Sequence, residues 1–192
     1  MIRFERVPEP ETFDARVRVR GNAWLKEHST GRLRDYWREF TPQLRAGFRG
    51  LCAYSAMYIQ SGDVDHFAPC VTNRALAYEW SNYRYADASL NSRKQGRAVE
   101  EMLDPFEVDD HWFEVILPSL QLVVTDRCPE ALRGRARLMI DGLGLGHSDW
   151  VLDIRRGQRC HRVLAHETSD LRGPVDRVPQ EIEGGIVLPG RL

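Results

Sequence analysis

The chain lacks the cysteine spacing, the long apolar runs and the leader segment that mark several classes of protein. Its four cysteines include no C-x-x-C pair, which argues against a disulfide framework and against a zinc site made of four cysteines. No apolar run approaches the ~20 residues that cross a bilayer, and the first residues lack the apolar core of a signal peptide. We therefore expect reduced thiols, a cytoplasmic location and no contact with a membrane.

A nucleotide-binding loop of the form G-x-x-x-x-G-K-S/T is also absent, so any dependence on ATP would require another protein. The formal net charge is only −1, but the charges are segregated along the chain. Residues 16–49 hold nine Lys and Arg against three acids, whereas residues 99–115 hold seven acids and no Lys or Arg. This segregation can make a basic face on a near-neutral protein, although a solvated helix face would have the same composition.

Capping and turn residues predict an α+β fold that forms one domain with arms. The chain of 192 residues divides into an N-terminal helical arm (1–50), a core (51–97) and a C-terminal α+β elaboration packed on that core (98–192). The expected helices cover residues 12–28, 32–40, 42–48, 91–95, 129–143 and 148–167. The expected strands cover residues 51–59 and 64–67, which pair with each other, and a hairpin within 112–124. A long functional loop over 70–90 and an irregular tail over the last two dozen residues complete the prediction.

The residues with the clearest chemistry lie between 64 and 97. His66 has an unperturbed pKa of ~6.5, which suits a general base that takes a proton from water near neutral pH. Asp65 and Asn91 offer oxygen ligands, which suit Mg²⁺ or Mn²⁺ better than zinc. Asn82 is expected to hold the ring of His66 through a hydrogen bond. Together these residues predict a one-metal phosphodiesterase site.

Cations follow on the same short helix. Lys94 lies three residues after Asn91 and therefore on the same helix face, and Arg93 and Arg97 are close by. We expect Lys94 to act in catalysis and the two arginines to bind nucleic acid. Taken singly, an Asp-His dipeptide is usually a surface pair, and a lone Asn is usually a loop or helix cap. It is their order and spacing together that favour a site.

Five short motifs carry a resemblance to a known family. They are Cys-Ala-Tyr at Cys52, Asp-His-Phe-Ala-Pro at Asp65, Glu-Trp-Ser-Asn at Glu79, Asn-Ser-Arg-Lys at Asn91 and Asp-Pro-Phe at Asp104. Over residues 50–160 the chain resembles bacterial HNH proteins, a group that includes the nuclease subunit of Septu-type anti-phage systems. The resemblance implies a ββα-metal (HNH, or His-Me finger) core and cleavage of DNA in anti-phage defence or restriction. It also implies an ATPase or sensor partner.

One part of the family pattern is missing. Many relatives join the two halves of the motif with a zinc bound by two C-x-x-C pairs. Here Ser55 stands where the second cysteine would be, and Asp87 and Leu90 stand where the other pair would be. We therefore expect no structural zinc. Apolar packing should replace it, supplied by Tyr54, Leu76, Trp80, Tyr83 and Leu90.

Two other functions remain open from the residues alone. A catalytically inactive HNH-fold binding subunit would also fit the missing zinc ligands and the low net charge. An RNA-cleaving toxin could use the same metal site, although no RNA-specific motif is present. A single site cuts one strand, so a double-strand break would require a homodimer or repeated nicking.

Overall fold

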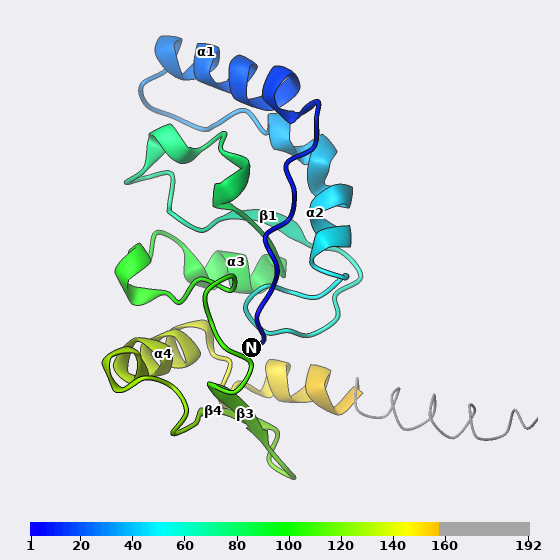
Figure 1. Cartoon of the computed structure of the whole chain (residues 1–192), viewed down its shortest axis with the longest axis vertical. Helices are drawn as coiled ribbons and strands as arrows, with labels where there is room; N and C mark the ends of the chain where they lie inside the picture. Colours follow the sequence, from blue (N-terminus) through cyan, green and yellow to red (C-terminus); the bar gives the residue numbers. More distant parts are fainter. Residues whose placement is uncertain (158–192) are drawn as a thin grey trace, which may run out of the picture. The chain divides into compact units, whose positions relative to one another are not determined.

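The computed structural model describes residues 1–157, which belong to one compact unit of mixed α and β structure (Figure 1). Its helical segments are η1 (Asp14–Arg18), α1 (Val19–Glu27), η2 (Tyr36–Phe40), α2 (Thr41–Gly47), η3 (Arg74–Leu76), η4 (Trp80–Asn82), α3 (Ala88–Lys94), η5 (Val99–Glu101), α4 (Glu130–Leu143) and a last helix over 149–157. Its strands are β1 (Asp63–His66), β2 (Tyr83–Ala86), β3 (Phe113–Ile116) and β4 (Gln121–Val124). The α+β class is therefore confirmed. Cys160, the predicted tail and the end of the predicted helix over 148–167 lie outside the described residues.

Two antiparallel strands followed by a helix position the candidate site. Strand β1 pairs with β2 in a register that sets His66 opposite Tyr83. Helix α3 starts directly after β2, because the Asp87 side chain caps it by accepting hydrogen bonds from the backbone N–H groups of Ser89 and Leu90. The predicted helix begins at Asn91, whereas α3 begins three residues earlier.

The expected pairing of residues 51–59 with β1 is wrong. Within that segment the structure has one isolated bridge, between Leu51 and Tyr58. The chain turns between them, with Ala56 in the left-handed region at φ 57° and its N–H bonded to the carbonyl of Cys52. Burial explains the failure: the apolar residues of this segment enter the core as a turn rather than as one face of a strand.

Strand β2 falls inside the stretch that was expected to be a loop. Its four residues are all buried, so the alternation that marks a half-buried strand is missing. Arg84 supplies the polar residue in this run. It forms two hydrogen bonds with Asp104, at 2.6 and 3.0 Å, and its guanidinium carbon lies 4.0 Å from the centroid of the Phe106 ring. The Asp-Pro-Phe motif at Asp104 therefore neutralises and covers the arginine of β2.

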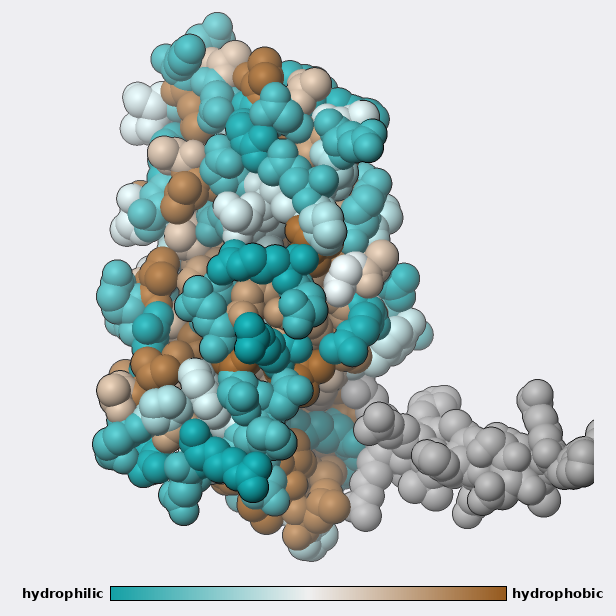
Figure 2. All heavy atoms as spheres, viewed as in Figure 1, coloured by the Kyte–Doolittle hydropathy of each residue, from teal (hydrophilic) through white to brown (hydrophobic). Residues whose placement is uncertain are grey.

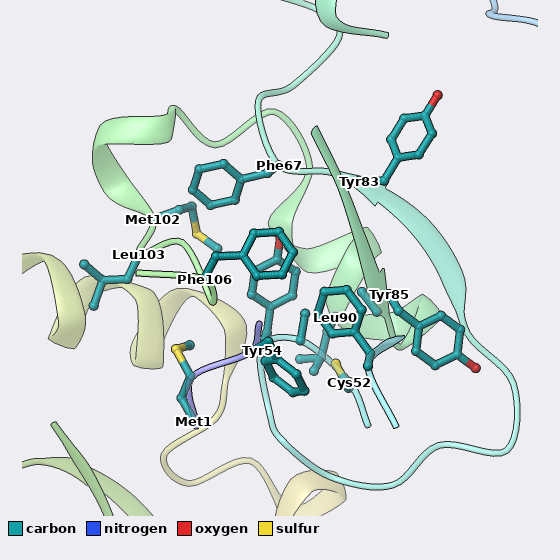
Figure 3. Packing of buried hydrophobic residues seen from close by; sticks show 14 of the residues in the cluster. Met1, Cys52, Tyr54, Phe67, Tyr83, Tyr85, Leu90, Met102, Leu103 and Phe106 are labelled. Carbon is teal, nitrogen blue, oxygen red and sulfur yellow. The ribbon is translucent and has the colours of Figure 1, made fainter. Parts of the chain in front are cut away.

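Most of the apolar residues that were predicted to pack together in place of a structural zinc are buried. Tyr54, Trp80, Tyr83 and Leu90 are all buried in the hydrophobic core, part of which is shown in Figure 3. Leu76 is 39% exposed, so its predicted place in this core is wrong. It lies in η3 on the long loop, whose surface position leaves its side chain outside.

The helices and the hairpin predicted outside the core are present, but one predicted helix is shorter than expected. The helix over 12–28 appears as η1 and α1, and that over 42–48 appears as α2, but only residues 36–40 of the segment 32–40 are helical. The hairpin within 112–124 is confirmed as β3–β4. Helix α4 ends at Leu143 and is capped by Gly144, whose φ of 67° suits glycine. At the hairpin tip Val115, Ile116 and Leu117 are exposed. The lower end of Figure 2, where Figure 1 shows this hairpin, has a brown surface. No helix in the described range is both long and apolar enough to cross a membrane.

Gly21 provides a test of the packing of α1. A Cβ built at this position would lie 2.2 Å from Cγ of Tyr78, a buried ring whose hydroxyl bonds to both the N–H and the carbonyl of Arg34. Because two hydrogen bonds to Arg34 hold the hydroxyl of this buried ring, Gly21→Ala should overpack the interface and lower the free energy of unfolding by about 1–3 kcal/mol in urea titrations.

Gly134→Ala is the matched control for that substitution. It also replaces a glycine inside a helix, but a Cβ there meets nothing within 4 Å. Helix propensity should then dominate and raise the free energy of unfolding by about 0.5–1 kcal/mol. Equal effects at the two glycines would contradict the packing of α1 against Tyr78.

Candidate functional site

Four of the predicted residues line one pocket. Asp65 and His66 come from the end of β1, and Asn91 and Lys94 come from one face of α3. The pocket has a volume of about 330 Å³. The i, i+3 spacing on α3 puts Asn91 and Lys94 side by side, as the sequence predicted. Asn82, which was predicted to orient His66, is buried and does not line the pocket.

Asp65 is the buried carboxylate of this pocket, with only 3% of its surface exposed, whereas Asp35, which also lines the pocket, is exposed. Its Oδ1 atom pairs with Nζ of Lys94 at 3.1 Å, and its Oδ2 atom accepts a short hydrogen bond from the hydroxyl of Tyr54. Lys94 is 2% exposed and donates a second hydrogen bond, of 2.7 Å, to the carbonyl of His66. The ion pair therefore ties α3 to β1 at the site.

Tyr54 is a site residue that the sequence analysis treated only as packing. Burial, with the nearby Asp65 carboxylate, raises the pKa of the Tyr54 hydroxyl well above its usual value, so it stays protonated and donates. This residue is part of the Cys-Ala-Tyr motif. The sequence alone does not distinguish a buried tyrosine that only packs from one that also donates a hydrogen bond to a site residue.

The ring of His66 has a defined orientation. Its Nε2 atom lies 2.8 Å from the carbonyl oxygen of Ala77, which also accepts a hydrogen bond of 2.9 Å from Tyr83. A carbonyl can only accept, so Nε2 carries the hydrogen and Nδ1 carries the lone pair. The indole of Trp37 meets the ring edge-on with centroids 4.7 Å apart. Nδ1 is thus the atom of His66 that can take a proton.

Burial also favours the neutral form of this imidazole. It lowers the pKa of His66, and the Lys94 ammonium acts in the same direction. The hydrogen bond to Ala77 and the Asp65 carboxylate raise the pKa; each effect is smaller than that of burial and larger than that of Lys94. Since the pKa falls below ~6.5, His66 is neutral and able to act as a base at pH 7.

Asn82 acts on the loop rather than directly on the imidazole. Its side chain accepts a hydrogen bond of 2.7 Å from the N–H of Ala68 and donates bonds of 3.1 Å to the carbonyls of Ala68 and Leu76. This clamp joins the two ends of the loop between β1 and β2. Because Ala77 follows Leu76, Asn82 positions the carbonyl that orients His66. The expected direct bond from Asn82 to the ring is replaced by this indirect one.

Arg93 and Arg97, predicted to bind nucleic acid at the site, lie away from the pocket. Neither lines the pocket. The guanidinium of Arg93 packs against Gly144, and that of Arg97 donates a hydrogen bond of 3.3 Å to the carbonyl of Gly142. Both arginines therefore contact the C-terminal end of α4, which the sequence pattern on α3 could not indicate.

The residues fit a divalent cation in chemical type. Asp65 and Asn91 supply a carboxylate and an amide oxygen at one pocket, and Mg²⁺ is commonly held by one or two carboxylates with water and phosphate completing its shell. Both oxygens of Asp65 already have partners, so a cation would compete with the ammonium of Lys94. Within residues 1–157, no group of three or more His, Cys, Asp or Glu is placed to hold a metal.

The cysteines give no support to a thiol reaction. Cys70 lines the same pocket as His66, but burial raises the pKa of its thiol to about 11, so it is protonated at neutral pH and is a poor nucleophile. Cys52, Cys70 and Cys128 are free thiols in the described chain. Cys52 accepts a hydrogen bond through Sγ from the N–H of Asp87 at 3.4 Å, which joins the turn over residues 51–58 to the start of α3.

No protein-family model matches the chain, and no curated protein matches it in sequence. Function must therefore be inferred from the geometry of the pocket and the chemistry of its residues.

Proposed function

We propose that this protein is a metal-dependent HNH endonuclease that hydrolyses phosphodiester bonds in DNA, with β1, β2 and α3 as its ββα-metal core. The main support is the convergence of Asp65, His66, Asn91 and Lys94 on one pocket, from a strand end and a helix face. A surface Asp-His pair or an isolated helix cap would not require this convergence. A binding subunit without chemistry would not require an imidazole held in one tautomer.

His66 is the general base in this mechanism. Its Nδ1 atom takes a proton from water, the resulting hydroxide attacks the phosphorus, and the bond to the leaving oxygen breaks, with solvent protonating that oxygen. Ala77, Tyr83 and Asn82 keep the ring in the required tautomer and orientation. Trp37 packs against the ring, and burial of the ring lowers its pKa.

Asp65 and Asn91 are the residues that would hold Mg²⁺ or Mn²⁺. When bound, the ion supplies charge neutralisation at the non-bridging and leaving oxygens. Lys94 is a positioning residue: it balances the charge of Asp65 and fixes α3 against β1. We further propose that the enzyme acts in the cytoplasm as an effector of anti-phage defence or restriction, together with an ATPase or sensor protein.

The experiment that tests this function is cleavage of supercoiled plasmid DNA with Mg²⁺ or Mn²⁺, compared with the same reaction in EDTA. We expect nicking that requires the metal. An RNA strand in a parallel reaction distinguishes the toxin alternative. Equal nicking in EDTA would contradict the mechanism, as would no nicking with either metal when proteins encoded by neighbouring genes are added.

The pH dependence of cleavage follows from the lowered pKa of His66. Because the base must be neutral, activity is lost as the pH falls through the pKa of the folded protein. The acidic limb of kcat/KM should therefore have its midpoint below pH ~6.5. A midpoint above that value would show that the imidazole is not in the desolvated environment described here.

A further inference from the structure

A second, larger cavity adjoins the catalytic pocket. This groove has a volume of about 1220 Å³ and lies between the η2–α2 segment and the residues around β1 and β2. The two cavities share five lining residues: Arg32, Asp35, Trp37, Val64 and Asn91. Because Trp37 also contacts His66, the groove leads to the edge of the proposed base.

The groove is positively charged. Four arginines line it, Arg32, Arg38, Arg45 and Arg49, against two aspartates, Asp35 and Asp63. The pair between Arg38 and Asp35 is 3.8 Å long and exposed, so it neutralises little of this charge.

Other basic residues of the N-terminal arm are paired more closely. Arg18 binds Glu9, Asp14 and Glu79, and Arg16 binds Glu39. The segregation of charge seen in residues 16–49 therefore produces a positive groove at a defined place.

The groove also holds hydrogen-bond donors without acceptors. Among the described residues, Nε of Arg45 and the hydroxyl of Tyr85 are buried and have no hydrogen-bond partner. Both residues line the groove, and Tyr85 directs its hydroxyl away from the core cluster (Figure 3). A buried donor without an acceptor is unfavourable, because it has lost its hydrogen bonds to water. A ligand rich in acceptor oxygens would supply the acceptor. Tyr58 also lines the groove, and its hydroxyl accepts a hydrogen bond of 3.2 Å from Nη2 of Arg45.

We propose that this groove binds one phosphodiester strand of the DNA substrate and leads it to the catalytic pocket. The arginines contact successive phosphates, and a positively charged groove of this kind is how proteins follow a single strand without reading its sequence. Arg32 lies where the two cavities join and contacts the phosphate next to the scissile one. This assignment rests on the proposed nuclease function, and it places the strand on the N-terminal arm rather than on Arg93 and Arg97.

The test is binding of a fluorescein-labelled single-stranded DNA oligonucleotide by fluorescence anisotropy over a range of salt concentrations. His66→Ala serves as the background, so that the probe is not cut. The double variant Arg32→Gln/Arg38→Gln removes two exposed groove charges. The control Arg127→Gln/Arg137→Gln removes two exposed charges that do not line the groove. Circular dichroism checks that both are folded.

The groove variant should bind about tenfold more weakly near physiological salt, and its plot of log K against log salt should be shallower by about 1.4, about 0.7 for each lost phosphate contact. The control should match the background. Equal weakening by both pairs, or none by the groove pair, would overturn the proposal. Either result would refute the groove but not the nuclease function, which is tested by metal-dependent nicking with the wild-type chain. If the groove variant binds more weakly but the wild-type chain does not nick DNA, only the nuclease function is refuted.

Discussion

Replacing Asp65 with asparagine is expected to lower the free energy of unfolding by about 3–5 kcal/mol, the usual loss when one member of a buried ion pair is removed. The ammonium of Lys94, almost fully buried, would keep the carbonyl of His66 and the ring of Phe67 as neighbours but would have lost its counter-ion. Asparagine still offers an oxygen to the Tyr54 hydroxyl, so the decrease in the free energy of unfolding is due to the missing negative charge. Urea titration followed by circular dichroism measures it.

The double variant Asp65→Asn/Lys94→Met decides whether the two charges stabilise each other. Lys94→Met alone should cost a similar amount, because it leaves a buried carboxylate without a counter-ion. Removing both charges should cost clearly less than the two single losses combined. Asp153→Asn, which breaks an exposed pair with Arg156, should change stability by less than about 1 kcal/mol. Additive losses at Asp65 and Lys94 would contradict the buried pair.

The second large effect is on catalysis: His66→Ala should reduce the single-turnover rate of DNA cleavage by about 10²–10⁴-fold, the contribution of a positioned general base. Binding of DNA should change little, since the groove arginines are intact. Added imidazole should restore part of the rate, because it can occupy the space left by the ring and accept the proton. A purely structural role for His66 would give no such rescue.

His111→Ala is the matched control for this substitution. His111 is exposed and lines neither the pocket nor the groove, so its removal should leave the rate unchanged. Equal rates for wild type and His66→Ala would remove His66 from the mechanism and the proposed nuclease with it.

Much of the candidate site could be predicted because its residues lie close together in sequence. Asp65 and His66 are adjacent, and Asn91 and Lys94 are one helical turn apart, so local geometry brings each pair together. The meeting of the two pairs depends on β2, which returns the chain to β1. This strand escaped prediction because Arg84, its polar residue, is buried, and its partner Asp104 lies 20 residues further on.

Long-range contacts account for the other differences. Tyr54 reaches Asp65 only because residues 51–58 turn instead of extending. Arg93 and Arg97 are predicted at the substrate because they neighbour Lys94. In the structure α4 packs against α3, and both side chains contact the C-terminal end of α4 instead. Neither feature has a signal within a short window of sequence, since both are decided by which distant segment supplies the partner.

The most direct measurement of the central claim is a calorimetric titration of the wild-type chain with Mn²⁺, compared with Asn91→Ala. Asn91 lines the pocket from a partly exposed position on α3, so its removal should leave the fold intact. Asn73→Ala, on the loop between β1 and β2 and outside the pocket, is the control. We predict one ion per wild-type chain, the same for Asn73→Ala, and affinity at least about tenfold weaker for Asn91→Ala. Equal affinity in all three chains, or no uptake by the wild type, would contradict a cation site between β1 and α3.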